Sequence, residues 1–407
     1  MSRGWWTAGI LVFALGLAGC APGPSGSGGT ADTGSGTPNP AASAPASSTA
    51  ASTTGESSII DPATACLSYA QQLSLAEQVG QLYMTVLMAG ADVDQAAAQI
   101  NASGNGAVIL LGNRTAGLAA VQAETQQLQD FAPGIPLLIA TDQEGGLVQK
   151  LSGPGFDTIP SAVDQASLDD AELRASWQRW GQELRDAGVN WNLAPVADVV
   201  PAGQAANNAA IGQLERGYGS DPATVGDKVA EVITGLSDSG VASSAKHFPG
   251  LGNVNENTDF AVGHDQTSQL TAADLTSFQA AIDAGASSVM VSSAVYDQVD
   301  PDNPAVFSSA IVTGILRERM GFDGVVVSDD LGAAVAVENY PAADRGLMFL
   351  KAGGDMAVVA DAVAAQQMVD TTLSAAQADP KLAAQIATKA ARVLELKSDL
   401  GLMNCSA

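Results

Sequence analysis

Apolar residues along this chain occur in short runs that alternate with longer stretches of a different periodicity. Eight of these runs are mostly aliphatic, and they lie at 82–88, 106–111, 135–140, 189–194, 241–245, 288–292, 324–327 and 356–360. The stretches between them are rich in Ala, Leu and Gln at the spacing of a helix face. Short aliphatic runs without hairpin turns between them predict parallel strands joined by crossover helices. Eight such units predict an α/β fold, a single-domain (β/α)8 barrel of the TIM type.

The composition changes at the amino-terminal end of the chain. Arg3 precedes a short apolar core, and Leu17-Ala18-Gly19-Cys20 resembles the bacterial lipobox, whose Cys is acylated. A transmembrane anchor is the alternative, but the apolar run is shorter than the roughly 20 residues that span a bilayer. Residues 21–58 are almost entirely Gly, Ser, Thr, Ala and Pro and can bury no core. We expect a lipoprotein signal peptide at 1–20, a disordered tether at 21–58 and a folded barrel at 59–407, held outside the cytoplasmic membrane by a lipid at Cys20.

The chain is strongly acidic, which limits the partners that it can bind. Its formal net charge is −26, and it has only 17 Lys and Arg residues. Nucleic acids and anionic lipid surfaces are bound by clustered cations, so we expect neither nucleic acid nor direct adhesion to anionic lipid. Two His and three Cys at no ligand spacing predict no metal site, and we expect no cofactor.

Two cysteines lie at opposite ends of the expected barrel. Cys66 is near its start and Cys405 is near its end, and the first and last elements of a closed barrel are neighbours. A location outside the cytoplasm permits oxidation, so we expect a disulfide between them. Two separate buried thiols are the alternative, because the sequence does not give the distance between the two residues.

Polar residues follow two of the expected strands. The run at 241–245 is followed by Lys246-His247-Phe248-Pro249-Gly250, and the run at 324–327 is followed by Ser328-Asp329-Asp330. The carboxyl ends of parallel strands meet on one face of a barrel, where ligands bind. A retaining glycosidase needs an ionised carboxylate beneath the anomeric carbon and a proton donor above the leaving oxygen. The two motifs therefore indicate a sugar-cleaving site.

Five segments, in this order along the chain, resemble the motifs of glycoside hydrolase family 3. They lie at 141–150, 192–199, 216–222, 246–250 and 328–331. The similarity extends over residues 70–400 and is to the single-domain bacterial β-N-acetylhexosaminidases. It implies a retaining hydrolase that removes terminal β-linked N-acetylglucosamine, with peptidoglycan fragments of the cell wall as the expected substrate. The alternatives are a β-glucosidase or β-xylosidase of the same fold, transfer to another acceptor, or a catalytically weakened sugar-binding lipoprotein.

The same resemblance implies roles for individual residues. Asp329 matches the nucleophile; its alternative is a helix N-cap, a role that Asp330 or Ser328 could take instead. The residues that match positions holding the hydroxyls of the terminal sugar are Asp142, Lys150, Arg216, Lys246 and His247. A salt-bridge network at the barrel rim is the alternative, above all for Lys150, where the family usually has Arg. We expect a monomer that binds a carbohydrate substrate.

The proton donor is the point at which the sequence departs from the family. The family loop usually reads His-Gly-Asp-Thr followed by Asp-Ser-His, and the last Asp and His form the proton-transfer dyad. Here Asn257 and Asp259 stand at the dyad positions, and Leu147 stands where Arg is common. We expect Asp259 to be the acid/base, because burial or the charge of the nucleophile can raise the pKa of a carboxyl group. Glu256 and His264 are the alternatives, together with a loss of catalysis.

Overall fold

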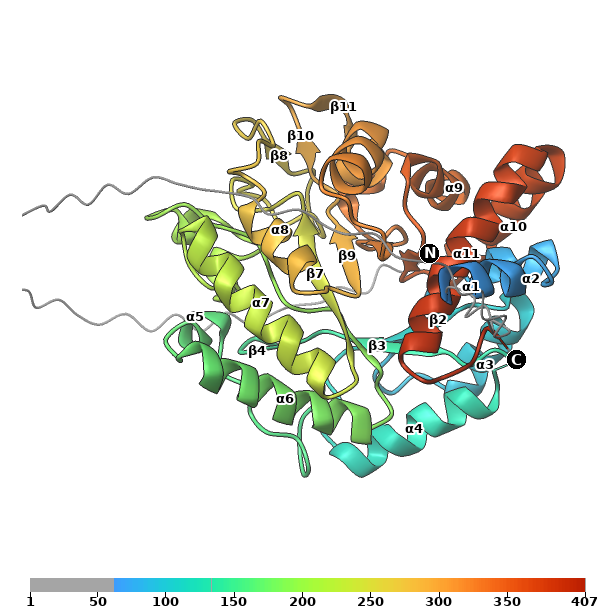
Figure 1. Ribbon diagram of the computed structural model, residues 1–407, viewed down its shortest axis with the longest axis horizontal. Helices are drawn as coiled ribbons and strands as arrows, with labels where there is room; N and C mark the ends of the chain where they lie inside the picture. The colour runs from blue at the N-terminus through green and yellow to red at the C-terminus, as the bar shows by residue number, and fades with distance from the viewer. Residues whose placement is uncertain (1–61, 133, 407) are drawn as a thin grey trace, which may run out of the picture. The chain divides into compact units, whose positions relative to one another are not determined.

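An eight-stranded parallel barrel forms the centre of the structure. The computed structural model describes residues 62–132 and 134–406 (Figure 1). Neighbouring strands pair in the order β12, β9, β7, β6, β3, β2, β1 and β13. Their bounds are β1 (Tyr83–Met88), β2 (Ala107–Leu111), β3 (Leu138–Thr141), β6 (Trp191–Asn192), β7 (Ala242–Phe248), β9 (Ser288–Val291), β12 (Val325–Ser328) and β13 (Ala357–Val359). A parallel bridge between Val327 and Met356 joins β12 to the last strand, so the barrel is nearly closed.

All eight predicted strands are present, and the predicted α/β barrel of the TIM type is confirmed. The predicted end of one strand was wrong, and this strand carries residues of the expected site. β7 does not stop at 245 but continues to Phe248, so Lys246 and His247 lie within the strand and not after it. Apolar periodicity placed the end too early, because this strand finishes with polar side chains that are nevertheless buried.

Helices surround the strands (Figure 1). The α-helices are α1 (Pro62–Ala70), α2 (Leu75–Gly80), α3 (Val93–Ser103), α4 (Leu118–Asp130), α5 (Ala162–Gln165), α6 (Asp170–Asp186), α7 (Pro222–Asp238), α8 (Thr276–Asp283), α9 (Ala342–Ala352), α10 (Ala362–Ala378) and α11 (Pro380–Asp399). A π-helix, η4, spans Ala310–Arg319, and the short 3-10 helices are η1 (Ala205–Asn207), η2 (Gly212–Leu214), η3 (Ala305–Phe307) and η5 (Val335–Val337). Within 62–132 and 134–406, no helix has both the length and the apolar character needed to cross a membrane.

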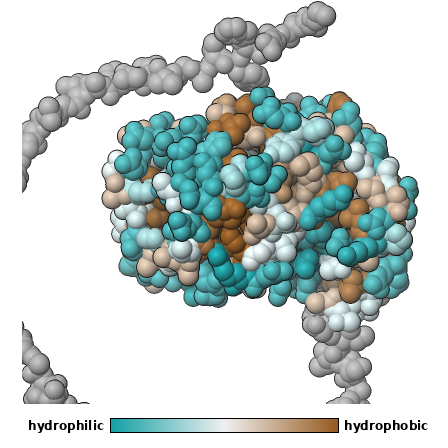
Figure 2. All heavy atoms as spheres, turned by 90° about the horizontal axis from the view of Figure 1, so that it is seen from above, coloured by the Kyte–Doolittle hydropathy of each residue, from teal (hydrophilic) through white to brown (hydrophobic). Residues whose placement is uncertain are grey.

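Several of the acidic residues cap the amino-terminal ends of helices. Side-chain oxygens accept hydrogen bonds from backbone N–H groups of the first turn at five aspartates, Asp92, Asp169, Asp221, Asp361 and Asp379. Such caps satisfy donors that have no partner within the helix, and the positive end of the helix dipole favours the carboxylate. Hydrophilic residues also cover most of the face shown in Figure 2, with apolar groups lying between them.

A disulfide joins the two ends of the described domain. It links Cys66 in α1 to Cys405, which follows α11, and the two Cα atoms lie 4.8 Å apart. The bonded residues are separated by 339 positions in the sequence. The first helix is therefore covalently connected to the segment that follows the last helix. The predicted signal peptide, its Cys20 and the predicted tether lie outside the described residues.

Two small sheets lie in the loops that follow the barrel strands. β4 (Gln143–Gly145) and β5 (Val148–Gln149) form an antiparallel pair directly after β3. β8 (His264–Asp265), β10 (Val295–Tyr296) and β11 (Asp300–Pro304) form the other sheet, from the loops after β7 and β9. In barrels of this type the loops at the carboxyl ends of the strands build the ligand site. The two small sheets therefore order the backbone of the loops around that site.

Lys397 of α11 is buried without a charged partner. Its Nζ donates a hydrogen bond to Oε1 of Gln81 at 2.6 Å, and none of the ion pairs of the described residues includes it. Burial lowers the pKa of Lys397 to about 7, whereas an unfolded lysine titrates near about 10.4. Between these values the unfolded chain binds more protons than the folded one, so the stability should rise with pH across this window.

We predict that Lys397→Met reduces this pH dependence. The free energy of unfolding of the unchanged protein should rise between about pH 7 and 9, by up to about 1.4 kcal/mol per pH unit for one proton. The variant should show a smaller rise but not a flat profile, because burial also lowers the pKa of Lys389 to about 8. Urea unfolding measures both slopes, with Lys381→Met on the exposed side of α11 as the control. Equal slopes for Lys397→Met and the unchanged protein would contradict the prediction.

Candidate functional site

A cavity of about 440 Å³ opens at the carboxyl ends of the barrel strands. Asp142 enters it directly after β3, β7 contributes two side chains, and Asp329 follows directly after β12. The predicted site residues that line it are Asp142, Lys150, Arg216, Lys246, His247, Asp259 and Asp329. The fold therefore brings together side chains that are far apart in the sequence, in a concave space large enough for a small molecule.

Two cations and two carboxylates form one ion-pair network, here called the floor network. Lys246 Nζ lies 2.6 Å from Asp142 Oδ1 and 2.7 Å from Glu144 Oε1. Arg216 binds both oxygens of Glu144, at 2.7 and 2.8 Å. Burial would raise the pKa of Glu144, but Arg216 and Lys246 outweigh it and hold that pKa well below its usual range. Burial would likewise lower the pKa of Lys246, but Asp142 and Glu144 raise it, so the pair stays charged.

Glu144 was not among the predicted site residues. It lies in β4, two positions after Asp142, and residues two apart on an extended chain face the same side. That spacing of two carboxylates was the signal in the sequence that could have identified it. The structure shows that Glu144 connects Arg216 to Lys246, which come from different loops and strands.

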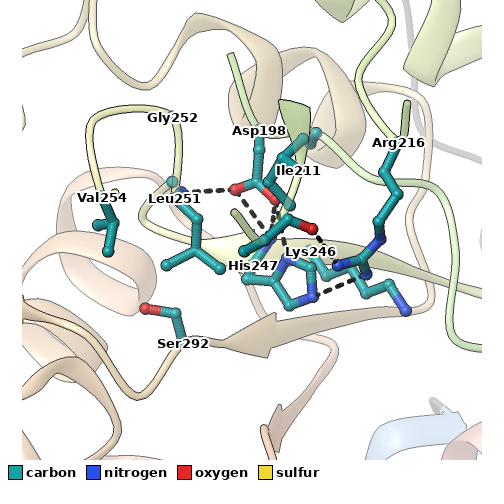
Figure 3. A network of polar contacts seen from close by, with 12 residues as sticks. Asp198, Ile211, Arg216, Lys246, His247, Leu251, Gly252, Val254 and Ser292 are labelled. Atoms are coloured by element: carbon teal, nitrogen blue, oxygen red, sulfur yellow. Dashed lines mark hydrogen bonds and ion pairs between the residues drawn. The ribbon is translucent and has the colours of Figure 1, made fainter. Parts of the chain in front are cut away.

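His247 is fixed on both sides of its ring. Its Nδ1 lies 2.7 Å from Asp198 Oδ2, and its Nε2 lies 3.3 Å from Arg216 Nη2 (Figure 3). A guanidinium can only donate, so Nε2 must accept this hydrogen bond and Nδ1 must carry the proton. We therefore assign His247 as the neutral tautomer that donates to Asp198.

Asp198 is a second residue that the sequence analysis missed. It is fully buried after β6, and it accepts hydrogen bonds from the His247 ring, the His247 backbone N–H and the Leu251 backbone N–H (Figure 3). The bond from Leu251, at 2.7 Å, connects β7 to the loop that follows it. A carboxylate within an otherwise apolar segment was the signal that could have identified it, since such a group needs buried donors.

The neighbouring carboxylates after β12 have different roles. Asp330 accepts hydrogen bonds from the backbone N–H groups of Gly332, Ala333 and Ala360. Asp329 accepts only from the N–H of Asp330, through Oδ1, and among the described residues its Oδ2 has no hydrogen-bond partner. No helix begins at either residue, so the helix N-cap considered for Asp329 is not observed. Asp330 instead holds the turn after β12, and one oxygen of Asp329 is free to face the cavity.

Asp259 lies at the same cavity as Asp329. Its backbone N–H donates to Asn257 Oδ1 at 3.0 Å, and its carbonyl accepts from Val335 N at 3.3 Å. Burial, followed by the charge of Asp329, raises the pKa of Asp259 to about 6, although the charge of Arg216 acts in the opposite direction. Asp259 is nevertheless an exposed residue, so water screens part of this effect. A carboxyl group in this range can both hold and release a proton near neutral pH.

The alternatives to Asp259 lie elsewhere. Glu256 is exposed and does not line the cavity. His264 lies in β8, also outside the cavity lining, with its Nδ1 2.8 Å from Asp297 Oδ1. Lys150 does line the cavity, and no ion pair among the described residues includes it, so the salt-bridge alternative is not observed for this residue.

Asn208 holds the base of the loop that carries Asp259. Its side chain is buried, and Nδ2 donates to the carbonyl oxygens of Leu251, Gly252 and Val254 at 2.8, 3.2 and 2.9 Å. Its Oδ1 accepts from the N–H groups of Ile211 and Gly212. This residue was also missed, and no sequence signal distinguishes it from the adjacent Asn207, whose side chain is exposed.

Known proteins with similar sequences and folds include glycoside hydrolases. A beta-hexosaminidase of Stenotrophomonas maltophilia (strain R551-3) is 36% identical over 270 residues, which cover 63% of this chain and 77% of the relative. The crystal structure of a β-N-acetylhexosaminidase from Beutenbergia cavernae DSM 12333 is 46% identical, with a TM-score of 0.78 over 80% of this chain and 99% of that chain. A family 3 β-N-acetylglucosaminidase from Paenibacillus sp. str. FPU-7 is 30% identical, with a TM-score of 0.73 over 81% of this chain and 63% of that chain.

The family comparison covers most of the barrel. The model of the glycosyl hydrolase family 3 N terminal domain matches residues 74–396, a range that includes every residue lining the cavity. From this match and these relatives, we conclude that the chain belongs to glycosyl hydrolase family 3 and is a glycoside hydrolase.

Proposed function

We propose that this glycoside hydrolase removes terminal β-linked N-acetylglucosamine by a retaining mechanism, with Asp329 as nucleophile and Asp259 as acid/base. The observation that carries the proposal is that the carboxyl groups of Asp259 and Asp329 line one cavity and that one oxygen of Asp329 has no hydrogen-bond partner among the described residues. The raised pKa of Asp259 supports its role as the proton donor. The environments of a nucleophile and of a proton donor differ in this way in retaining glycosidases. The names of the relatives support N-acetylhexosamine as the sugar.

The reaction proceeds in two steps. Asp329 attacks the anomeric carbon while Asp259 transfers its proton to the glycosidic oxygen, so the bond to the leaving sugar breaks as the bond to Asp329 forms. Asp259, now ionised, then takes a proton from water, and the resulting attack at the anomeric carbon releases Asp329. The floor network holds the hydroxyls of the terminal sugar, because charged groups make stronger hydrogen bonds than neutral ones, and the neutral His247 lies beside it.

The proposal also covers the cellular setting. Leu17-Ala18-Gly19-Cys20 resembles a lipobox, and the segment after it is long and polar. These features support a lipoprotein attached at Cys20 to the outer side of the cytoplasmic membrane. At that location the fragments of peptidoglycan are an accessible source of β-linked N-acetylglucosamine, so we propose them as the substrate.

The roles of the two carboxylates predict different losses of activity. Asp329→Ala should abolish turnover of every substrate, because no covalent intermediate can form. Asp259→Ala should slow an unactivated disaccharide far more than an activated aryl glycoside, and added azide should restore the second step. For the unchanged enzyme kcat/KM on the disaccharide should fall as the pH rises above about 6, where Asp259 loses its proton. Steady-state kinetics test this, and wild-type rates of Asp259→Ala on the disaccharide would refute the assignment.

Asn208 provides a separate test of the loop. Asn208→Asp keeps the shape of the side chain but replaces the donor Nδ2 with an oxygen that faces three carbonyl oxygens. We expect kcat/KM to fall by roughly 5- to 150-fold, because about 1 to 3 kcal/mol of hydrogen bonding to the loop is lost. The matched control is Asn207→Asp, which changes an exposed side chain bonded only to Gln204. Similar activity in the two variants would show that the loop does not depend on Asn208.

The lipid anchor is tested by Cys20→Ala. A lipid chain contributes membrane affinity for each buried methylene, whereas a polar tether contributes almost none. We expect the variant to leave the membrane fraction and to keep full activity in the soluble fraction. Fractionation followed by an activity assay measures both, and a variant that stays in the membrane pellet would exclude anchoring through Cys20.

A further inference from the structure

Two large apolar side chains lie at the rim of the catalytic cavity, whose buried side carries the charged floor network. Phe260 and Leu147 both line the cavity, and their side chains are 78% and 70% exposed. The lysine and the glutamate of the floor network are almost completely buried. A large exposed aromatic side chain at the mouth of a ligand site leaves apolar area that a ligand can cover.

Both rim side chains are held by ordered backbone. Leu147 follows Gly145 and Gly146 in the turn between β4 and β5, where both glycines have positive φ. A Cβ at Gly145 would lie 2.2 Å from the carbonyl oxygen of Pro160, so this turn packs closely against its neighbour. The backbone N–H of Phe260 donates to the carbonyl of Asn257 at 3.0 Å. The exposed side chains therefore project from fixed positions.

The position of Phe260 in the chain determines which part of a substrate it meets. It directly follows Asp259, the proposed donor of a proton to the glycosidic oxygen. The group bonded to that oxygen on the leaving side must therefore lie next to the same loop. The terminal sugar, in contrast, reaches inward to the floor network.

We propose that Phe260, with Leu147, forms a subsite for the leaving group and binds the apolar face of a second pyranose ring. This inference rests on the proposed function, because it takes Asp259 as the acid/base. The C–H groups on one face of a β-linked pyranose form an apolar surface, and its hydroxyls project around the edge. Stacking this face on Phe260 removes apolar area from water while the hydroxyls stay hydrated. The subsite would thus favour substrates whose leaving group is a sugar ring.

The test compares two substrates that both need a proton from Asp259. Diacetylchitobiose has a pyranose leaving group, whereas methyl β-N-acetylglucosaminide has a leaving group without a ring. Phe260→Ala should lower kcat/KM for the disaccharide by roughly 3- to 10-fold, the range of one aromatic contact, and change it less than about 2-fold for the methyl glycoside. Phe260→Trp should retain the preference for the disaccharide, and Leu147→Ala should lose part of it.

The control is Phe131→Ala, which changes a residue that follows α4 and is 36% exposed. This variant should leave kcat/KM unchanged for both substrates. Equal losses on both substrates would overturn the inference, because Phe260 would then act only through the position of Asp259. An unchanged rate of Phe260→Ala on the disaccharide would overturn it as well. If the unchanged enzyme cleaves the methyl glycoside but shows no preference for the disaccharide, the proposal of a leaving-group subsite is refuted while the proposed function is retained. If it cleaves neither substrate, the proposed function fails and the subsite with it.

Discussion

The burial of charge is the constraint on which the catalytic cavity depends. Removing one partner from a buried ion pair typically costs about 3 to 5 kcal/mol, so the four side chains of the floor network fix one another's positions. Their two cations and two carboxylates balance. Even when Asp259 carries its proton, the carboxylates of Asp329 and Asp330 outnumber the one further cation at the cavity, Lys150. The resulting negative field suits a reaction in which positive charge develops on the sugar.

Hydrogen bonds between side chains and the backbone, more than regular secondary structure, fix the conformation of the loops around that network. Asp330 gathers backbone N–H groups from two loops, and Asn257 receives the N–H of Asp259. The Nδ2 of Asn208, in contrast, donates hydrogen bonds to backbone carbonyl oxygens of the loop. Loops fixed by such bonds hold a carboxyl group at a defined position, which a proton donor requires. Asn257 stands where the resemblance places an acidic member of the dyad, and here it shapes the turn.

The barrel could be predicted from the sequence because strands buried on both sides leave a simple apolar pattern. That pattern failed at the end of β7, where buried Lys246 and His247 look like loop residues in the sequence. The motifs identified the residues around Asp329 and favoured Asp259 over Glu256 by position alone. Only the folded loop shows that Asp259 lines the cavity and Glu256 does not. The roles of Asp198 and Asn208 depend on partners distant in the sequence, and no local pattern reports such partners.

The disulfide between Cys66 and Cys405 has a consequence for the covalent topology of the molecule. It turns almost the whole barrel into one closed ring of chain. A protease that cuts a single surface loop opens this ring but leaves its two segments in one covalent molecule, held together by the bond and by the packing of the strands. Release of a fragment then requires either a second cut or reduction of the bond, so an isolated nick need not separate Asp259 from Asp329.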